Sequence, residues 1–476
     1  MAFKAPRPPS VVEQAAGAQR LVTRLEMLPE AIERHSRATA LICVATPAEV
    51  SDLKEQLRHG SQPTTPVSLG QRPIDIVLGV DFGTSSVKIA ARLPYEPGSP
   101  IVAIPVPSFA RAEDHPYLWA SRLWLGPDGS FSLHPAPRAA VFCAIKAGLM
   151  TPPQPGTCTA TTLANAAAPE ELATAFLALQ VQHARGWLAS ERAALMQRGH
   201  LKWSYNFGFP AASLNNAVLS EKYQRCVAAA LSLAASAADV TLTTTRAALT
   251  GVGSNPTGQL EAMQASLIPE IAAAVSGFAN STMLDDGLYA LVDVGGGTVD
   301  CCTFNLFKSR DGESKCPIFA ADVSMLGVEP WKACSTDRKL ANYFRWDLDR
   351  RQRGVIWQTK KRRDPNSERW SSALPVFLIG GGVKSAVHAA SAHSLDPWLR
   401  KFNSAGGGIR LMRLPAAAGL DHELCPATMV DRLAVAIGLS MSVQDIPEIK
   451  LPNVIDDIAT EQIRPNDDRF VGKEQM

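Results

Sequence analysis

One pattern occurs twice in this chain, and it constrains the fold more than any other feature of the sequence. Residues 74–93 hold two apolar, β-branched runs on either side of DFGTSS (81–86), and residues 288–304 hold two more on either side of DVGGGT (293–298). Each unit is typical of a two-stranded hairpin with a polar, glycine-containing tip. Because the same unit recurs about two hundred residues later, the sequence predicts a duplicated architecture.

A third glycine turn, Gly380-Gly381-Gly382, follows an apolar strand-like run (376–379) and precedes a helical pattern. Around the three turns, strand patterns alternate with helical ones, which predicts the α/β class. The clearest further elements are strands over 101–106 and 202–209, helices over 46–60, 169–198, 220–238 and 432–441, and a turn-rich loop over 251–258.

The residues at these tips suit a metal-bound phosphate ligand. Backbone N–H groups approach phosphate oxygens closely where glycine has no side chain. Mg²⁺ prefers carboxylate oxygens, usually through water. If the two repeated units face each other across a cleft, Asp81 and Asp293 flank one metal-bound triphosphate, and the third turn lies under its base or ribose. No G-x-x-x-x-G-K-[ST] motif and no G-x-G-x-x-G after a strand is present, so neither a P-loop nor a Rossmann site competes.

Composition excludes several other classes of protein. The 476 residues include 47 Lys and Arg against 45 Asp and Glu, a near balance that argues against a dedicated nucleic-acid or anionic-membrane binder. No apolar run reaches the ~18 residues of a membrane span. The nine cysteines are scattered, without C-x-x-C spacing, which argues against a disulfide framework or a zinc site. We therefore expect a cytoplasmic protein.

The three glycine turns resemble the motifs of a known superfamily. DFGTSSVK (81–88), DVGGGTVD (293–300) and LIGGGVKS (378–385) look like the phosphate-one, phosphate-two and adenosine motifs of the actin-like ATPases. Within that superfamily the chain is most similar to the ATPase domain of DnaK-type, seventy-kilodalton heat-shock chaperones. The resemblance covers roughly residues 74 to 445. Four smaller matches follow in family order: VFCAIKAGLM (141–150), APEELATAFLAL (168–179), FPA (209–211) and IPEIAAAVSGFA (268–279).

The resemblance implies a fold and a division into domains. The fold would be the two-lobed actin-like ATPase fold, in which duplicated ribonuclease-H-like lobes surround a nucleotide cleft, here with a small N-terminal α/β extension. Residues 1–73 would be this extension and its linker, 74–287 lobe I, 288–450 lobe II, and 451–476 a C-terminal tail. The 35 residues after Met441 are too few for the peptide-binding domain of the chaperones, so chaperone action by that route is not expected.

The resemblance also implies roles for individual residues, with ATP or ADP and Mg²⁺ as the cofactors. Asp81 and Asp293 would organise Mg²⁺ and the attacking water, Lys146 would hold that water and the γ-phosphate charge, and Glu270 would couple the cleft to lobe closure. Lys384 could lie along the adenine. The phosphates would be cradled by the tip residues Gly83, Thr84, Ser85, Ser86, Gly295, Gly296, Gly297 and Thr298, and the third turn would contribute Gly380, Gly381 and Gly382.

These roles predict an Mg-ATP-binding, slowly hydrolysing ATPase that acts as a nucleotide-dependent conformational switch on an unidentified protein partner. The partner surface would be residues 1–73 or the segment 337–370, which holds eleven Lys and Arg against five Asp and Glu. For the latter segment we favour a solvated face over a nucleic-acid patch. Two alternatives remain open: a small-molecule kinase of the same superfamily, and an actin-like filament or scaffold protein.

Overall fold

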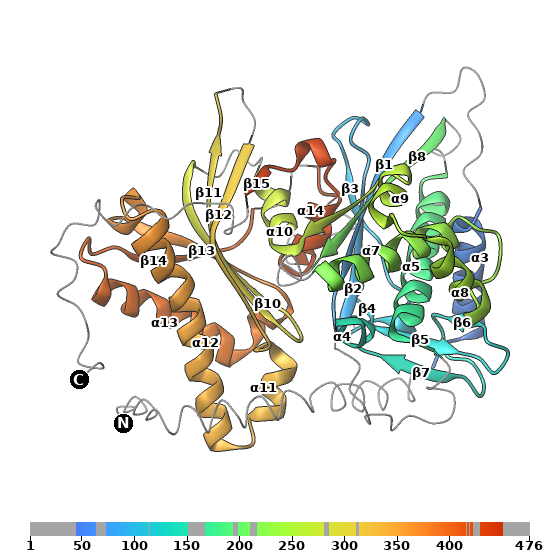
Figure 1. The fold of residues 1–476 in the computed structure, drawn as a ribbon, viewed down its shortest axis with the longest axis horizontal. Coiled ribbons are helices and arrows are strands. Elements are labelled where there is room, and N and C mark those ends of the chain that lie inside the picture. Colours follow the sequence, from blue (N-terminus) through green and yellow to red (C-terminus); the bar gives the residue numbers. More distant parts are fainter. Residues whose placement is uncertain are drawn as a thin grey trace.

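The computed structural model describes residues 44–62, 73–113, 115–150, 167–193, 199–209, 217–279, 285–310, 314–415, 417, 419–421 and 429–450. Within these residues the chain forms three β-sheets with helices packed around them (Figure 1). This arrangement confirms the α/β class. The predicted tail (451–476), the FPA turn beyond Phe209 and most of the N-terminal extension lie outside the described residues.

The N-terminal sheet contains the first glycine-tipped hairpin. Strands β1 and β2 are antiparallel, β3 pairs antiparallel with β2, and β8 and β9 continue from β1 in parallel, so that the order is β3-β2-β1-β8-β9. The two-residue strand β4 also pairs with β2. The bounds are β1 Pro73–Phe82, β2 Ser86–Arg92, β3 Ile101–Ala103, β4 Trp119–Ala120, β8 His200–Phe209 and β9 Ala265–Pro269.

The C-terminal sheet contains the second and third glycine turns. Strands β10 and β11 form an antiparallel hairpin, β12 pairs antiparallel with β11, and β13 and β14 continue from β10 in parallel. The short strand β15 closes the other edge beside β12. The bounds are β10 Gly287–Val294, β11 Val299–Lys308, β12 Ser314–Ser324, β13 Ala373–Ile379, β14 Gly408–Met412 and β15 Glu448–Lys450.

Five strands of each sheet therefore repeat one plan. The order β3-β2-β1-β8-β9 has the same succession of antiparallel and parallel pairings as β12-β11-β10-β13-β14. In both sheets the first strand is central and largely buried, and its last residue but one is an aspartate, Asp81 or Asp293. Because parallel neighbours of the first strand end at the same edge, the turns after β1, β10 and β13 can meet at one place.

Helices of the first half cover the N-terminal sheet and are capped as their sequences predict. Helix α5 (Pro169–Glu191) begins with Pro169 in its first turn, and Glu171 accepts a bond from the N–H of Ala168 at 2.8 Å. Helix α7 (Ala217–Ala234) packs against α5, as does α3 (Pro47–Gly60). Since α3 contacts α5 along its length, the described part of the predicted extension belongs to the first half rather than standing apart (Figure 1).

The predicted loop over 251–258 is only partly a loop. Helix α8 (Leu242–Gly251) precedes it, but helix α9 (Pro256–Ala262) already begins inside it. The side chain of Asn255 accepts a bond from the N–H of Gly258 at 3.0 Å, and Pro256 occupies the first turn. Turn-forming residues serve equally well as a helix start, which is why the composition misled the prediction.

A three-stranded sheet lies beside the N-terminal sheet and leads to Lys146. Its order is β6-β5-β7, with β5 Arg122–Leu125, β6 Phe131–Ser132 and β7 Ala140–Cys143. Helix α4 (Ile145–Met150) follows β7 after one residue, Ala144, whose φ of 51° turns the chain sharply. The side chain of Lys146 is thereby brought to the edge of the N-terminal sheet.

Two central helices cross from one half of the chain to the other. Helix α10 (Glu270–Ala279) follows β9 of the N-terminal sheet, yet its buried face lies in the cluster formed by strands of the C-terminal sheet, Tyr289 and Phe377 among them. Helix α14 (Val430–Leu439) follows β14 of the C-terminal sheet and packs against β1, β2 and β8. The two helices contact each other between the sheets (Figure 1).

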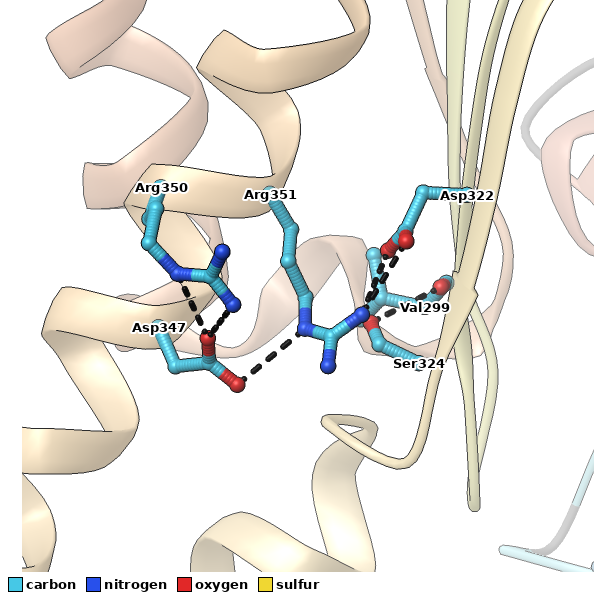
Figure 2. Close-up of polar contacts among 6 residues, drawn as sticks. All are labelled: Val299, Asp322, Ser324, Asp347, Arg350 and Arg351. Carbon is cyan, nitrogen blue, oxygen red and sulfur yellow. Dashed lines mark hydrogen bonds and ion pairs between the residues drawn. The ribbon is translucent and has the colours of Figure 1, made fainter. Parts of the chain in front are cut away.

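The basic segment 337–370 forms helix α12 (Arg338–Gln358), a short π-helical turn (Thr359–Arg363) and a 3-10 turn (Glu368–Trp370). Figure 2 shows how α12 is tied to the C-terminal sheet. Asp347, which is buried, accepts bonds from Arg350 at 2.6 Å and Arg351 at 3.1 Å, and Arg351 also bonds Asp322 of β12 at 3.0 Å. Part of the positive charge of this segment is therefore neutralised by neighbouring carboxylates.

The end of β12 contacts the second glycine tip. The hydroxyl of Ser324, at the end of β12, donates to the backbone oxygen of Val299 at 3.2 Å (Figure 2). Val299 is the first residue of β11, directly after the tip residue Thr298. Helices α11 (Val328–Cys334) and α13 (Ala386–Phe402) complete the layer beside α12. Among the described residues, no helix is both long enough and apolar enough to cross a membrane.

Candidate functional site

All three glycine turns line one pocket between the two sheets. Its volume is about 140 Å³, and its walls come from both halves of the chain. Of the residues predicted for the site, those that line it are Asp81, Gly83, Thr84, Ser85, Ser86, Lys146, Glu270, Asp293, Gly295, Gly296, Gly297, Thr298, Gly380, Gly381 and Gly382. Lys384 is the one predicted residue that does not line this pocket; it ends the 3-10 turn (Gly381–Lys384) after β13.

The first hairpin carries an acid and a base directly opposite each other. Asp81 and Lys88 are register partners on β1 and β2, and the Lys88 ammonium lies 3.0 Å from a carboxylate oxygen of Asp81. Both side chains are largely buried, with 8% of Asp81 and 18% of Lys88 exposed. Lys88 therefore supplies a positive charge beside Asp81 that the sequence analysis did not predict.

The second hairpin carries two acids at the corresponding positions. Asp293 and Asp300 are register partners on β10 and β11. Burial raises the pKa of Asp293 to about 7, although the Lys88 ammonium opposes this shift. Burial also raises the pKa of Asp300 well above its ordinary value, with the negative charges of Glu270 and Asp293 adding to the effect. One oxygen of Asp300, Oδ1, is buried without a hydrogen-bond partner among the described residues.

The two hairpin tips face each other closely. A Cβ atom built on Gly296 would lie 2.0 Å from the hydroxyl oxygen of Ser85, and one on Gly297 would contact Thr84 at 3.7 Å. On its far side the second tip is fixed by the start of α11. The N–H groups of residues 327, 328 and 329 donate to the carbonyl oxygens of residues 297, 295 and 296 at 3.1, 3.2 and 2.8 Å. Glycine at 296 is thus required by the approach of the other half.

Lys146 is held beside the first tip through Ser121. The N–H of Ser121 donates to the carbonyl oxygen of Ser85 at 3.1 Å, and the hydroxyl of Ser121 accepts from the N–H of Ile145 at 3.2 Å. The Lys146 side chain is 6% exposed and forms an ion pair with Glu270, the first residue of α10. A buried lysine is thereby held at the pocket by a carboxylate that begins a central helix.

The third turn touches both the second hairpin and α14. Gly380 has a φ of 89°, and a Cβ atom there would lie 2.2 Å from a carboxylate oxygen of Asp293. Its N–H donates to the carbonyl oxygen of Asp431 at 3.2 Å. Gly381 lies against the guanidinium group of Arg432, at 2.9 Å from its Nη2 atom to a built Cβ. The prediction that this turn shares a site with Asp293 agrees with the geometry.

A second hollow lies between α11, α12 and α13. It has a volume of about 380 Å³ and is lined by small and apolar side chains together with Arg345 and Asp349. The Arg345 guanidinium lies over the ring of Trp331, 4.9 Å from its centroid. Asp349 accepts a bond from Arg353 at 3.0 Å and another from Ser391. The remaining lining residues are Leu348, Ala386, Val387, Ala390 and Ser394.

The donor set of the first pocket suits a cation held largely through water. Seven carboxylates line it, against the two ammonium groups of Lys88 and Lys146 and the guanidinium group of Arg432. The carboxylates are those of Asp81, Glu113, Glu270, Asp293, Asp300, Glu329 and Asp431. No three His, Cys, Asp or Glu side chains in the described part of the chain are placed to hold a metal ion directly. Mg²⁺ commonly keeps several waters and uses only one or two carboxylates, so Asp81 and Asp293 could hold it.

Six charged residues of the pocket were missed by the sequence analysis: Lys88, Asp300, Glu113, Arg432, Glu329 and Asp431. The first two could have been found, because in a tight hairpin the residue across from a known aspartate follows from counting along both strands. Glu113 and Arg432 lie far apart in the sequence, and no local pattern marks them. No family model matches the chain, and no curated protein matches it.

Proposed function

We propose that this protein binds Mg-ATP, hydrolyses it slowly and uses the nucleotide cycle as a conformational switch, as a member of the actin-like ATPase superfamily that is most similar to the DnaK-type ATPase domains. The observation that carries this proposal is the meeting of all three glycine turns with Asp81, Asp293, Lys146 and Glu270 in one pocket. The repeated strand plan of the two sheets supports it further, since a duplicated fold with a cleft between its halves is what the resemblance implies.

Within this proposal the tips position the triphosphate. The N–H groups around Gly296 and Gly297 and the hydroxyls of Thr84 and Ser85 would donate to its oxygens from opposite sides. Bound Mg²⁺ would neutralise part of the phosphate charge. Lys146 would place a positive charge at the γ-phosphate, because its pairing with Glu270 holds the ammonium inside the pocket.

The second hollow would receive the base. Trp331 of α11 and Ala386 at the start of α13 line it, and its walls are mostly apolar, as a purine requires. Asp349 of α12 also lines it and pairs with Arg353 at 3.0 Å, so its carboxylate is a candidate ligand of the ribose.

The size of the pocket favours a switch over a static binding site. A volume of about 140 Å³ is below the ~300–1,000 Å³ of typical small-molecule sites, and Ser85 lies against Gly296. A triphosphate can therefore enter only when the two tips separate. Binding would change the position of one half of the chain relative to the other, and a partner protein would recognise this change.

The test is phosphate release from Mg-ATP by the purified full chain without any acceptor, together with equilibrium ATP binding. We expect slow turnover in the unchanged protein and at least a hundredfold loss in both Lys146→Ala and Asp293→Ala. Lys222→Ala is the matched control, because Lys222 also forms an ion pair with a glutamate, Glu170, at 2.8 Å but lies outside the pocket.

The possible outcomes separate the parts of the proposal. Turnover that survives in both variants would contradict the assigned roles of Lys146 and Asp293. Tight ATP binding without phosphate release, followed by formation of ADP and of the phosphorylated acceptor when a sugar or carboxylate is added, would replace the ATPase by a small-molecule kinase. Absence of ATP binding would overturn the assignment of all three glycine turns.

A further inference from the structure

Arg432 occupies an unusual position at the mouth of the pocket. It lies in the first turn of α14, with its guanidinium group packed under Gly381 of the third turn. A Cβ atom at residue 381 would approach three atoms of that group within 2.9 to 3.1 Å, so the guanidinium can lie there only because residue 381 is glycine. The side chain is 17% exposed and belongs to the lining of the pocket.

The partner of Arg432 comes from the other half of the chain. Its Nη1 atom lies 3.0 Å from a carboxylate oxygen of Glu113, on the loop that follows β3. Glu113 is 69% exposed, and its φ of 53° lies in the left-handed region, which is strained for a residue with a side chain. Because the Glu113 carboxylate is largely in water, this ion pair is weak and is easily exchanged for another.

One N–H donor of the Arg432 guanidinium group makes no hydrogen bond to any described residue. That donor is on the Nε atom, which is buried. A guanidinium group offers five N–H donors in a planar fork that matches the oxygens of a phosphate or carboxylate. The Glu113 carboxylate therefore satisfies only part of what Arg432 presents to the pocket.

Glu113 opposes several cations at this place. The pKa of His115, two residues beyond Glu113, is lowered to about 4 by burial and by the charges of Arg432, Lys384 and Lys88, while Glu113 acts in the opposite direction. His115 is thus neutral at physiological pH and does not add to the positive charge. A phosphate could take over the part that Glu113 has beside Arg432.

We propose that Arg432 is a nucleotide-binding residue that contacts a phosphate of the ligand, and that Glu113 takes the place of this phosphate in the free protein. This inference rests on the proposed function, since it names a further ligand contact of the same pocket. When the nucleotide binds, Arg432 exchanges the Glu113 carboxylate for a phosphate oxygen, and the loop that carries Glu113 is released from α14.

The test is the dissociation constant for ATP of the full-length protein and of the Arg432→Gln, Glu113→Gln and double variants. We expect Arg432→Gln to weaken ATP binding at least tenfold, because a charge-assisted contact is lost. Glu113→Gln should strengthen it two- to fivefold, because the competing carboxylate is neutralised. The double variant should bind like Arg432→Gln.

Two controls test whether the effect is specific. Adenosine has no phosphate, so its affinity should change less than twofold in Arg432→Gln. Arg92→Gln and Asp445→Asn remove a matched ion pair of 3.1 Å in which Arg92 is 16% exposed, and this pair lies outside the pocket. Both should leave ATP binding unchanged.

Opposite signs for the two single variants are what distinguishes this inference from a structural role. Equal weakening by Arg432→Gln and Glu113→Gln would mean that the ion pair merely holds the two halves together, and would overturn the inference. Unchanged ATP binding in Arg432→Gln would overturn it while leaving the proposed function intact. A protein that binds no nucleotide at all would overturn both.

Discussion

In the hairpin of β1 and β2 the residue across from Asp81 is Lys88, whereas in the hairpin of β10 and β11 the residue across from Asp293 is Asp300. The backbone plan is the same, and the strands on either side repeat it. The first hairpin neutralises its own aspartate, while the second brings two carboxylates together inside the protein and responds with raised pKa values.

This difference shows which half of the pocket lacks a counter-charge. In the first hairpin Lys88 neutralises the charge of Asp81 without a ligand. The second tip holds its charge only at a cost, which a bound cation or a bound proton removes. If the proposed function is correct, the metal-bound nucleotide compensates chiefly the second hairpin, and three substitutions or conditions can test that asymmetry.

The largest effect is expected from Lys88→Met. Removing the ammonium leaves Asp81 buried without its counter-charge, and we expect the free energy of unfolding to fall by ~3 kcal/mol in a urea titration. The double variant with Asp81→Asn should recover most of that loss. Lys202→Met is the control within the same sheet, since Lys202 pairs across the strands with Asp75 at 3.5 Å but is 49% exposed. A loss no greater than that of the control would refute the idea of a self-neutralised first hairpin.

A smaller change of opposite sign is expected from Asp300→Asn, at the position that corresponds to Lys88. Its buried carboxyl has one oxygen without a partner and raised pKa, so a neutral side chain of the same shape should increase the free energy of unfolding at pH 7 by ~1–3 kcal/mol. Unfolding without nucleotide measures this directly. Destabilisation by Asp300→Asn would mean that its charge is already compensated in the free protein.

The third effect is a slope of stability with pH, which is spread over several pH units, so the change within any one unit is the smallest of the three. Because the pKa of Asp293 is raised from 3.8 to about 7, the folded protein binds more protons than the unfolded chain between these values. The contribution of Asp293 to stability is therefore fully present below pH 3.8 and is lost as pH rises to 7, by at most ~1.4 kcal/mol per pH unit. Asp293→Asn should remove this part of the slope. The measurement is the free energy of unfolding in urea of both proteins at a series of pH values. Parallel curves for the two proteins would argue against a buried, proton-binding Asp293.

Local patterns were sufficient to predict much of the fold. The cap of α3 is made by residues adjacent in the sequence, with the N–H of Glu49 donating to the hydroxyl of Thr46 at 3.3 Å and the N–H of Thr46 to the Glu49 carboxylate at 2.9 Å. Both hairpins lie where they were predicted, because apolar runs, aspartates and glycines are all adjacent in the sequence, although β11 continues to Lys308, four residues beyond the predicted run. Strand β3 is shorter than expected and ends at Ala103, since Pro105 and Pro107 lack the N–H that would continue it.

The parts of the site that were missed depend on contacts between distant segments. No pattern near Arg432 indicates that a loop more than three hundred residues earlier supplies its partner. The bonds from Arg351 to both Asp347 and Asp322 likewise depend on how α12 lies against β12, which its own basic sequence does not reveal. The sequence therefore predicts the glycine turns of the pocket, but it does not predict the charged side chains that distant segments place beside them.

The exchange of α10 and α14 between the sheets also affects how the chain acquires its structure during synthesis. Strands β1, β2 and β8 emerge from the ribosome long before α14, the helix that covers them, so their apolar surface stays open while the second half is made. Contacts over such a separation slow the search for the native state. A nascent chain of this protein is accordingly most exposed to aggregation just before α14 is made.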